Sequence, residues 1–153
     1  MNAVVFCVYL AAHLFDIFII VPNWRSGTVE EIRLYNAFFD VTDPRNFFQF
    51  LRPISILISI LCLVAYWRRG SPIRTLVIIA FLIDVGIYLF TSLYFSPIND
   101  YLFLVDQSSL DPALVSDMVS KWIASNYIRI ALVTVGFYTS VRAVHFAYPS
   151  RRM

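Results

Sequence analysis

Four long apolar stretches dominate the sequence, and polar residues separate them. The stretches cover residues 3–21, 47–67, 72–95 and 124–146. A helix that spans a bilayer needs about 20 predominantly apolar residues, and each stretch is close to that length. The pattern therefore predicts four transmembrane helices with two long polar connections, one after the first helix and one after the third.

Local signals indicate where the helices begin. Asp43-Pro44, Ser71-Pro72 and Asp111-Pro112 each pair an N-cap residue with a proline in the first helical position, where the missing N–H group costs no hydrogen bond. These pairs predict helices that start near residues 44, 72 and 112. With a rise of about 1.5 Å per residue, the last helix is longer than the membrane is thick, so its first turns should extend beyond the bilayer.

The first long connection carries the signature of a further short helix. Thr28 and Glu31 have the spacing of a capping box. Apolar residues follow at amphipathic helical spacing, namely Ile32, Leu34, Tyr35, Phe38 and Phe39. We expect a short helix here that lies at the membrane interface.

Composition supports a membrane protein and excludes other classes. The 153 residues are 59% hydrophobic and only 14% charged, and the mean hydropathy is +0.72. About a quarter of the residues are charged in a usual soluble domain. A net charge of +2 is too small to suggest a nucleic-acid surface. The predicted fold is an all-α integral membrane four-helix bundle, a single domain over residues 1–153, whose partners include membrane lipids.

The charged residues are distributed unequally between the two ends of the predicted bundle. We call side A the end with Met1, the turn 68–74 and the tail from residue 142, and side B the opposite end. Side B mixes acids with bases, whereas side A has no acid and six arginines: Arg68, Arg69, Arg74, Arg142, Arg151 and Arg152. The positive-inside rule predicts that side A and both termini are cytoplasmic, as in a bacterial inner-membrane protein. Three tryptophans mark the predicted membrane borders: Trp24, Trp67 and Trp122.

Small residues within the spans favour packing over chemistry. Cys7 and Cys62 lie in separate spans without a CxxC pair or a Cys/His cluster, so no metal site and no disulfide chemistry are predicted. We interpret both cysteines as small core residues. Gly86 and Gly136 are expected to let neighbouring helices approach closely.

Several polar residues lie well inside the spans, away from side A, where such side chains are costly and usually face the interior of the bundle. They are His13, Asp16, Arg52, Asp84, Asn126 and Arg129. Helix rise places Asp16, Arg52 and Arg129 roughly 6–9 Å inside the side B border, with the others deeper or close by. His13 and Asp16 share one helix face because they are three residues apart, as do Asn126 and Arg129.

Two arrangements of these residues are open. In the first, two arginines and two aspartates form a neutral, structural ion-pair network, which a buried cluster requires. In the second, a pocket opens toward side B, bounded by His13, Asp16, Arg52, Asn126 and Arg129, with the connection 22–43 as its lid. A kink at Pro53 would make room for it. Its expected aromatic roof consists of Phe47, Phe48, Tyr94 and Tyr127.

The residues around the third and fourth spans resemble a known family. They are Ser96-Pro97-Ile98-Asn99-Asp100-Tyr101-Leu102-Phe103 in the predicted loop after span three, Trp122, and Asn126-Tyr127-Ile128-Arg129. Together with Pro22, Trp24 and residues 47–53, they resemble the anthrone oxygenase-like membrane proteins, most of which are uncharacterised. The resemblance implies a four-helix membrane bundle in which Asn99, Trp122, Asn126 and Arg129 belong to the common pattern, and His13 with them. Some fungal members are associated with oxidation of an anthrone to a quinone without metal or flavin, so no cofactor is expected.

Three functions of different classes follow. The first is an oxygenase-like enzyme that acts on a lipophilic aromatic or quinone-like compound, with His13 as a base oriented by Asp16, and with Arg129 and Asn126 stabilising an oxyanion. Its catalytic residues would be His13, Asp16 and Arg129. The second is a non-catalytic binding or scaffold protein, and the third is a proton-coupled transporter that uses Asp16 and Asp84 as part of a homo-oligomer. The substrate-binding residues of the enzyme would be Arg52, Tyr94, Asn99, Trp122 and Asn126.

Overall fold

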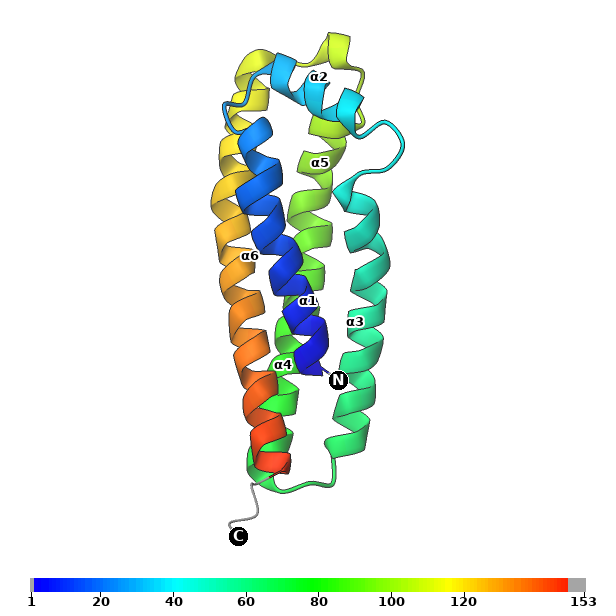
Figure 1. Cartoon of the computed structure of the whole chain (residues 1–153), viewed down its shortest axis with the longest axis vertical. Coiled ribbons are helices and arrows are strands. Elements are labelled where there is room, and N and C mark those ends of the chain that lie inside the picture. The colour runs from blue at the N-terminus through cyan, green and yellow to red at the C-terminus, as the bar shows by residue number, and fades with distance from the viewer. Residues whose placement is uncertain (1, 149–153) are drawn as a thin grey trace.

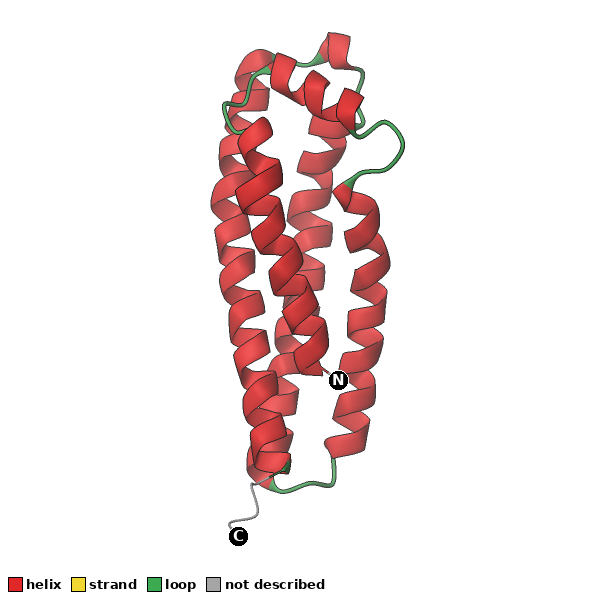
Figure 2. Ribbon diagram, in the orientation of Figure 1, coloured by secondary structure: helices red, strands yellow, loops and turns green. Residues whose placement is uncertain are grey.

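The computed structural model describes residues 2–148, and within them it contains helices and no strand. Four helical rods lie side by side along the long axis of the molecule (Figures 1 and 2). The first rod is α1 (Asn2–Phe15), which continues through a π-helical turn (Asp16–Ile20) and a 3-10 turn (Val21–Asn23); the second is α3 (Pro44–Tyr66). The third rod is α4 (Ser71–Phe90), a π-helical turn (Thr91–Phe95) and α5 (Ser96–Phe103); the fourth is α6 (Pro112–Ala147).

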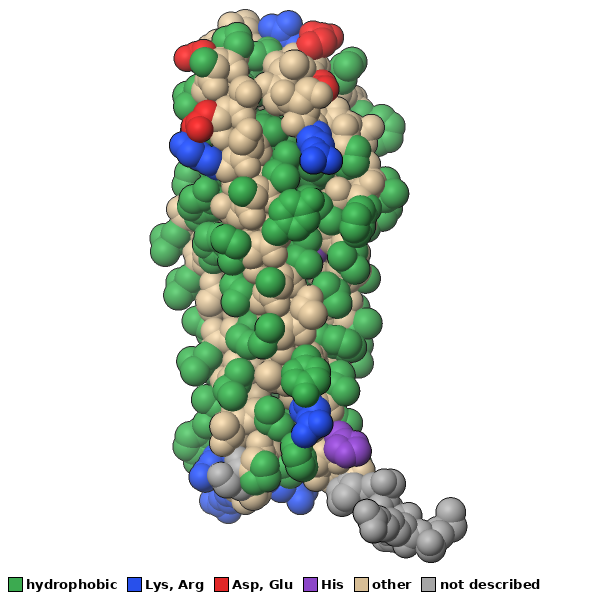
Figure 3. Space-filling view, turned by 90° about the vertical axis from the view of Figure 1, so that its left-hand side faces the viewer, with side chains coloured by type: hydrophobic (Ala, Val, Ile, Leu, Met, Phe, Trp, Pro, Cys, Tyr) green, Lys and Arg blue, Asp and Glu red, His purple; other side chains and the backbone are tan. Residues whose placement is uncertain are grey.

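The four rods are long and apolar enough to cross a membrane. Apolar side chains cover the middle of the face in Figure 3, and Lys, Arg, Asp and Glu side chains gather at the two ends. The predicted all-α membrane bundle is therefore confirmed, and the protein is an integral membrane protein. Met1, Arg151 and Arg152 lie outside the described residues.

Helix starts agree with the sequence signals. The side chain of Asp43 accepts a hydrogen bond from the Arg45 N–H group at 2.6 Å, and the side chain of Asp111 accepts one from the Ala113 N–H group at 2.9 Å. Both aspartates therefore cap their helices as predicted. The helix predicted from residue 72 begins one residue earlier, with Gly70 in the N-cap position.

The predicted short helix is α2 (Val29–Phe38), which lies across the side B end of the bundle (Figure 1). Thr28 caps it, since its hydroxyl accepts a hydrogen bond from the Glu31 N–H group at 3.2 Å. Gly27 precedes it with a φ of 68°, a backbone conformation that glycine adopts without strain. Ile32 and Tyr35 are buried against the bundle, whereas Leu34 and Phe38 are exposed.

Residues 96–103 were predicted to form a loop, and this prediction is wrong because they form α5. A proline ring normally clashes with the carbonyl group four residues earlier and ends the helix. The wider π-helical turn at Thr91–Phe95 ends two residues before Pro97, and there the Ser96 N–H group bonds to the Thr91 carbonyl five residues earlier. The first rod has the same arrangement, since its π-helical turn precedes Pro22. α3 continues unbroken through Pro53, and the kink expected there stays a prediction.

Packing between the rods is uneven. α6 packs extensively against α1 and α4, and α3 packs against α4, but α1 and α3 meet at few positions. At Gly136 an added Cβ atom would lie 2.3 Å from the Phe6 ring, so this glycine does permit a close approach. Gly86 does not, because an added Cβ atom would meet nothing within 4 Å. Cys7 is exposed rather than a core residue.

The three tryptophans differ in their surroundings. Only Trp67 is exposed, as an interfacial anchor would be, whereas Trp24 and Trp122 are buried and pack edge to face with ring centroids 5.0 Å apart. The prediction of three border residues therefore needs correction for two of them. The helices α2 and α5 cover this end of the bundle and turn it into a second apolar core.

Candidate functional site

A cavity of about 180 Å³ lies at the side B end of the bundle, and every rod contributes to its wall. Three of the polar residues predicted to bound a pocket line it: Asp16 on the first rod, Arg52 on α3 and Arg129 on α6. His13 and Asn126 do not line it. Phe48 is the one residue of the predicted aromatic roof that does so; Phe47, Tyr94 and Tyr127 lie elsewhere.

Arg129 is a buried cation surrounded by rings. Its guanidinium group lies 4.0 Å from the centroid of Phe95, and the rings of Trp122 and Phe48 are 5.7 Å and 6.0 Å away. Its Nε and Nη2 atoms donate to Oδ1 of Asn126 at 3.0 Å and 2.6 Å. Aromatic faces attract a desolvated guanidinium by about 2 kcal/mol, so these rings and one amide hold the charge in place.

The predicted ion-pair network is absent. Among residues 2–148 the ion pairs are Arg33–Glu30, Arg45–Asp43 and Lys121–Asp117. Arg52 instead donates from Nε to the Phe48 carbonyl at 3.1 Å. The two arginines thus contact rings, an amide and a backbone carbonyl rather than a carboxylate, and the Asp16 carboxylate has no ion-pair partner in the described chain.

Asp84 is part of a separate hydrogen-bonded cluster nearer side A. Its carboxylate accepts hydrogen bonds from Ser55 Oγ at 3.0 Å and Ser59 Oγ at 2.6 Å. Ser55 lies 3.2 Å from the hydroxyl of Tyr9, and Ser59 lies 3.2 Å from Oδ1 of Asn2. Asp84 is buried and does not reach the cavity wall, so it does not join Asp16 and the arginines.

His13 lies behind the cavity wall and is not oriented by Asp16. Its ring stacks on Phe48 with centroids 4.8 Å apart and on Tyr9 with centroids 6.0 Å apart. Both ring nitrogens are buried and have no hydrogen-bond partner in the part of the chain that the structure describes. The predicted His13–Asp16 pair therefore does not form, because stacking fixes the imidazole between two rings.

The other predicted binding residues divide between the cavity and its surroundings. Trp122 and Asn99 both line the cavity, and the indole Nε1 of Trp122 donates to Oδ1 of Asn99 at 2.8 Å. Asn126 supports Arg129 from behind. Tyr94 stacks on Phe90 with centroids 5.4 Å apart and lies away from the cavity.

A comparison with protein families matches residues 45–139 to the anthrone oxygenase family, which is more than half of the chain. The chain belongs to the anthrone oxygenase family. The suspected resemblance is therefore confirmed. Neither the curated proteins nor the solved structures contain a significant match to this family member.

The family match covers much of the cavity wall but not all of it. Arg52, Asn99, Trp122 and Arg129 fall within the matched range. Asp16 and His13 precede it. In this anthrone oxygenase family member two carboxylates of the cavity have no ion-pair partner among the described residues: Asp100 lies inside the match and Asp16 outside it.

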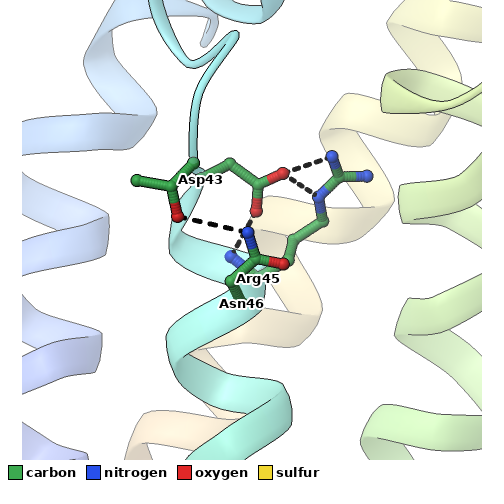
Figure 4. A network of polar contacts seen from close by, with 4 residues as sticks. Asp43, Arg45 and Asn46 are labelled. Atoms are coloured by element: carbon green, nitrogen blue, oxygen red, sulfur yellow. Dashed lines mark hydrogen bonds and ion pairs between the residues drawn. The ribbon is translucent and has the colours of Figure 1, made fainter.

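Some residues of the cavity were not predicted to belong to a site. At the start of α3, Asp43 accepts from both Nε and Nη2 of Arg45, and its carbonyl accepts from the Asn46 N–H group at 3.1 Å (Figure 4). All three residues line the cavity. The Asp43-Pro44 pair predicted only the start of α3. Because that start lies at the same end of the bundle as Asp16, Arg52 and Arg129, the pair could also have indicated that residues 43–46 belong to the site.

Tyr35 lines the cavity from above, on α2. Burial raises the pKa of its hydroxyl above the usual value, and the nearby Asp16 and Asp43 carboxylates raise it further. The phenol therefore stays protonated at physiological pH. Tyr35 can donate a hydrogen bond there, but it cannot act as a base.

Proposed function

We propose that this family member binds a lipophilic aromatic compound in the side B cavity and oxidises it with molecular oxygen. One observation carries the proposal: the cavity brings two guanidinium groups that form no ion pair, Arg52 and Arg129, and the unpaired carboxylate of Asp16 to one aromatic-lined space. A polar space enclosed by apolar helices suits a substrate that is mostly apolar and carries a few oxygens.

The chemistry can be assigned to these side chains. A methylene group between two aromatic rings and conjugated with a carbonyl, as in anthrone, loses a proton to a base and leaves an anion whose charge lies largely on the oxygen. Asp16 is the base in this proposal because its carboxyl group is buried at the cavity wall, whereas Asp100 is exposed and His13 stands behind Phe48. Arg129 and Arg52 stabilise the oxyanion.

The remaining steps balance without another reactant. The carbanion adds to one molecule of oxygen, and the resulting peroxide takes back the proton held by Asp16. The hydroperoxide then loses water, so that the methylene group becomes a carbonyl group. One oxygen molecule is consumed and one water is released, and the proposal assigns no cofactor.

Oxidation of anthrone by the purified protein in lipid nanodiscs tests this function. Quinone formation, followed by absorbance, should exceed the rate in empty nanodiscs and should be lost in Asp16→Asn. Asp117→Asn is the matched control, since that aspartate is exposed and pairs only with Lys121. Quinone formation no faster than in empty nanodiscs would contradict the proposal.

A non-catalytic binding or scaffold role is a second candidate. The specific observation in its favour is that rings and Asn126 already surround the charge of Arg129 and so could serve packing alone. A protein of this kind would bind no aromatic probe. Its stability would depend on Arg129, so replacing Arg129 and Asn126 with apolar residues separates the two roles.

We also propose that side A faces the cytoplasm of a bacterial cell. Arg68, Arg69, Arg74 and Arg142 support this orientation, and no acid accompanies them at that end. Alkaline phosphatase fused to the C-terminus should be inactive. An active fusion would place side A outside and reverse the topology.

A further inference from the structure

A second hollow lies beside the polar cavity and differs from it in character. It is a groove of about 1020 Å³ between the end of the first rod, the underside of α2 and the start of α3. It occurs where α1 and α3 contact each other sparsely. Apolar side chains dominate its wall, and five of the twelve lining residues are aromatic: Phe15, Tyr35, Phe38, Phe39 and Phe47.

The groove faces the bilayer. Phe15 and Phe47, on the two rods that flank it, are 57% and 47% exposed although both belong to helices long enough to span a membrane. Phe38 of α2 is 81% exposed. Such large apolar surfaces gain roughly 25 cal/mol per Å² when they leave water, so their natural surroundings are lipid.

The groove and the cavity share part of their walls. Tyr35, Asp43 and Pro44 line both. The Tyr35 ring contacts Phe39 on the groove side, with centroids 4.7 Å apart, and Phe103 on the cavity side, with centroids 4.8 Å apart. One aromatic side chain therefore stands between an apolar space open to lipid and a polar space that three arginines line.

We propose that this groove is the membrane entrance of the site. A planar aromatic substrate dissolved in the bilayer enters between α1 and α3, and passes Tyr35 to reach Arg52 and Arg129. The inference rests on the proposed function, because it assumes that the cavity is where the substrate is used.

The aromatic wall favours this occupant over an acyl chain. Ring pairs gain about 0.5–1.5 kcal/mol beyond the burial of their area, and a flexible acyl chain cannot obtain this gain. A second copy of the chain would cover the groove but would not use the wall shared with the cavity. The shared wall and the aromatic lining together point to a flat ring system.

Photolabelling tests the entrance on the full chain in nanodiscs. The probe is 2-azidoanthraquinone, with labelled peptides identified by mass spectrometry. Labels are expected on the segments 15–19 and 38–47 that flank the groove. In Ile19→Trp, which fills the groove from the first rod and does not touch the cavity wall, labelling of these segments should fall about ten-fold, the equivalent of about 1.4 kcal/mol.

Ile60→Trp is the matched control, since Ile60 is an exposed isoleucine of α3 away from both hollows. It should label like the unsubstituted protein, and anthrone oxidation should slow in Ile19→Trp but not in Ile60→Trp. Both results support the entrance.

Three results would overturn the entrance. One is labelling of the cavity segments without the groove, with oxidation unchanged in Ile19→Trp, which would leave the proposed function standing. Another is groove labelling that unlabelled 1,8-dihydroxyanthraquinone does not displace and an azide-bearing fatty acid reproduces, which would identify an acyl-chain site. The third is an absence of labelling anywhere. Groove labelling that the anthraquinone displaces, without any anthrone oxidation, would instead retain the entrance and contradict the proposed chemistry.

Discussion

The two aspartates buried in the two halves of the bundle, Asp84 and Asp16, have opposite surroundings. Toward side A, Asp84 accepts hydrogen bonds from two serines, and Tyr9 and Asn2 extend the cluster. Toward side B, the Asp16 carboxylate has no ion-pair partner among the described residues and borders a cavity with two arginines that form no ion pair, Arg52 and Arg129. Burying a polar group without a partner costs several kcal/mol in an apolar medium, so the difference calls for an explanation.

The backbone also differs between the two halves: helices pack closely near side A, whereas π-helical turns occur near side B. Near side A, Phe6 packs directly on the backbone at Gly136. Near side B, the first residues of the two π-helical turns, Asp16 and Thr91, both lie on the cavity wall. π-helical turns occur often at functional sites. The side A cluster is therefore best understood as structural, and the side B hollow as a space kept for a ligand.

Removal of Arg129 should have the largest effect and should act on binding rather than stability. In the double variant Arg129→Met/Asn126→Leu, affinity for 1,8-dihydroxyanthraquinone should fall about 10- to 100-fold, because a hydrogen bond to a charged group contributes about 1.5–3 kcal/mol. Thermal stability should be unchanged or higher, since replacing a buried charge with apolar side chains removes its desolvation cost. Fluorescence titration and thermal unfolding in detergent measure the two quantities.

Asn126→Leu is included because Asn126 is fully buried. In Arg129→Met alone, its Oδ1 atom would lose both hydrogen bonds that it accepts from Arg129. If the double variant unfolds and the unsubstituted protein binds no probe, the side B hollow is not a ligand site, and the scaffold role is favoured.

Gly136→Ala should destabilise the protein by about 1–3 kcal/mol, the usual cost of overpacking a tight contact. The added methyl group would meet the ring of Phe6, which is buried and cannot easily move. Gly86→Ala is the matched control: its methyl group meets nothing, and the helix gains up to about 1 kcal/mol in propensity. Equal midpoints of thermal unfolding for the two variants would show that the side A half is not tightly packed.

The helices were largely predictable from the sequence because their signals are local. Asp43-Pro44 and Asp111-Pro112 predicted helix starts that the structure confirms, since a capping side chain and a proline act on their own turn. Ser96-Pro97 carries the same local signal in the middle of a rod. The π-helical turn that comes before it has no signal in the sequence pattern, so the continuation of the helix could not be predicted.

The sequence predicted the depth of the site residues in the membrane, but it did not predict which groups their side chains contact. Helix rise alone brought Asp16, Arg52 and Arg129 to one level, and all three line the cavity. Charge balance then suggested ion pairs, which was wrong. Rings from two other segments, Phe48 and Phe95, are available to Arg129. Two serines one turn apart on α3 are available to Asp84. Such contacts depend on the rotation of each helix, which spacing alone does not determine.

Asp84→Ala should lower stability by about 1–2 kcal/mol, because the hydroxyls of Ser55 and Ser59 lose their buried acceptor. The loss stays modest because each hydroxyl can still bond to a backbone carbonyl in its own helix. Asp84→Asn is the conservative control and should retain most of the stability, since an amide can still accept from one of the two serines. Both variants should bind 1,8-dihydroxyanthraquinone as tightly as the unsubstituted protein, and weakened binding would instead connect Asp84 to the site.

Tyr9→Phe should have the smallest effect, about 0.6 kcal/mol, the average for a hydrogen bond between transmembrane helices. The substitution removes only the hydroxyl group, which lies 3.2 Å from Ser55, and leaves the ring stacked on His13. A double-mutant cycle with Ser55→Ala isolates this contact in thermal unfolding, and a coupling energy of zero would show that it does not form.

Probe binding to Tyr9→Phe tests whether the two halves are coupled, because Tyr9 stacks on His13, which stacks on Phe48 of the cavity wall. Unchanged affinity in Tyr9→Phe would keep the two halves independent, whereas a loss beyond about two-fold, roughly 0.4 kcal/mol, would show that the side A cluster positions the cavity wall through the stacked rings.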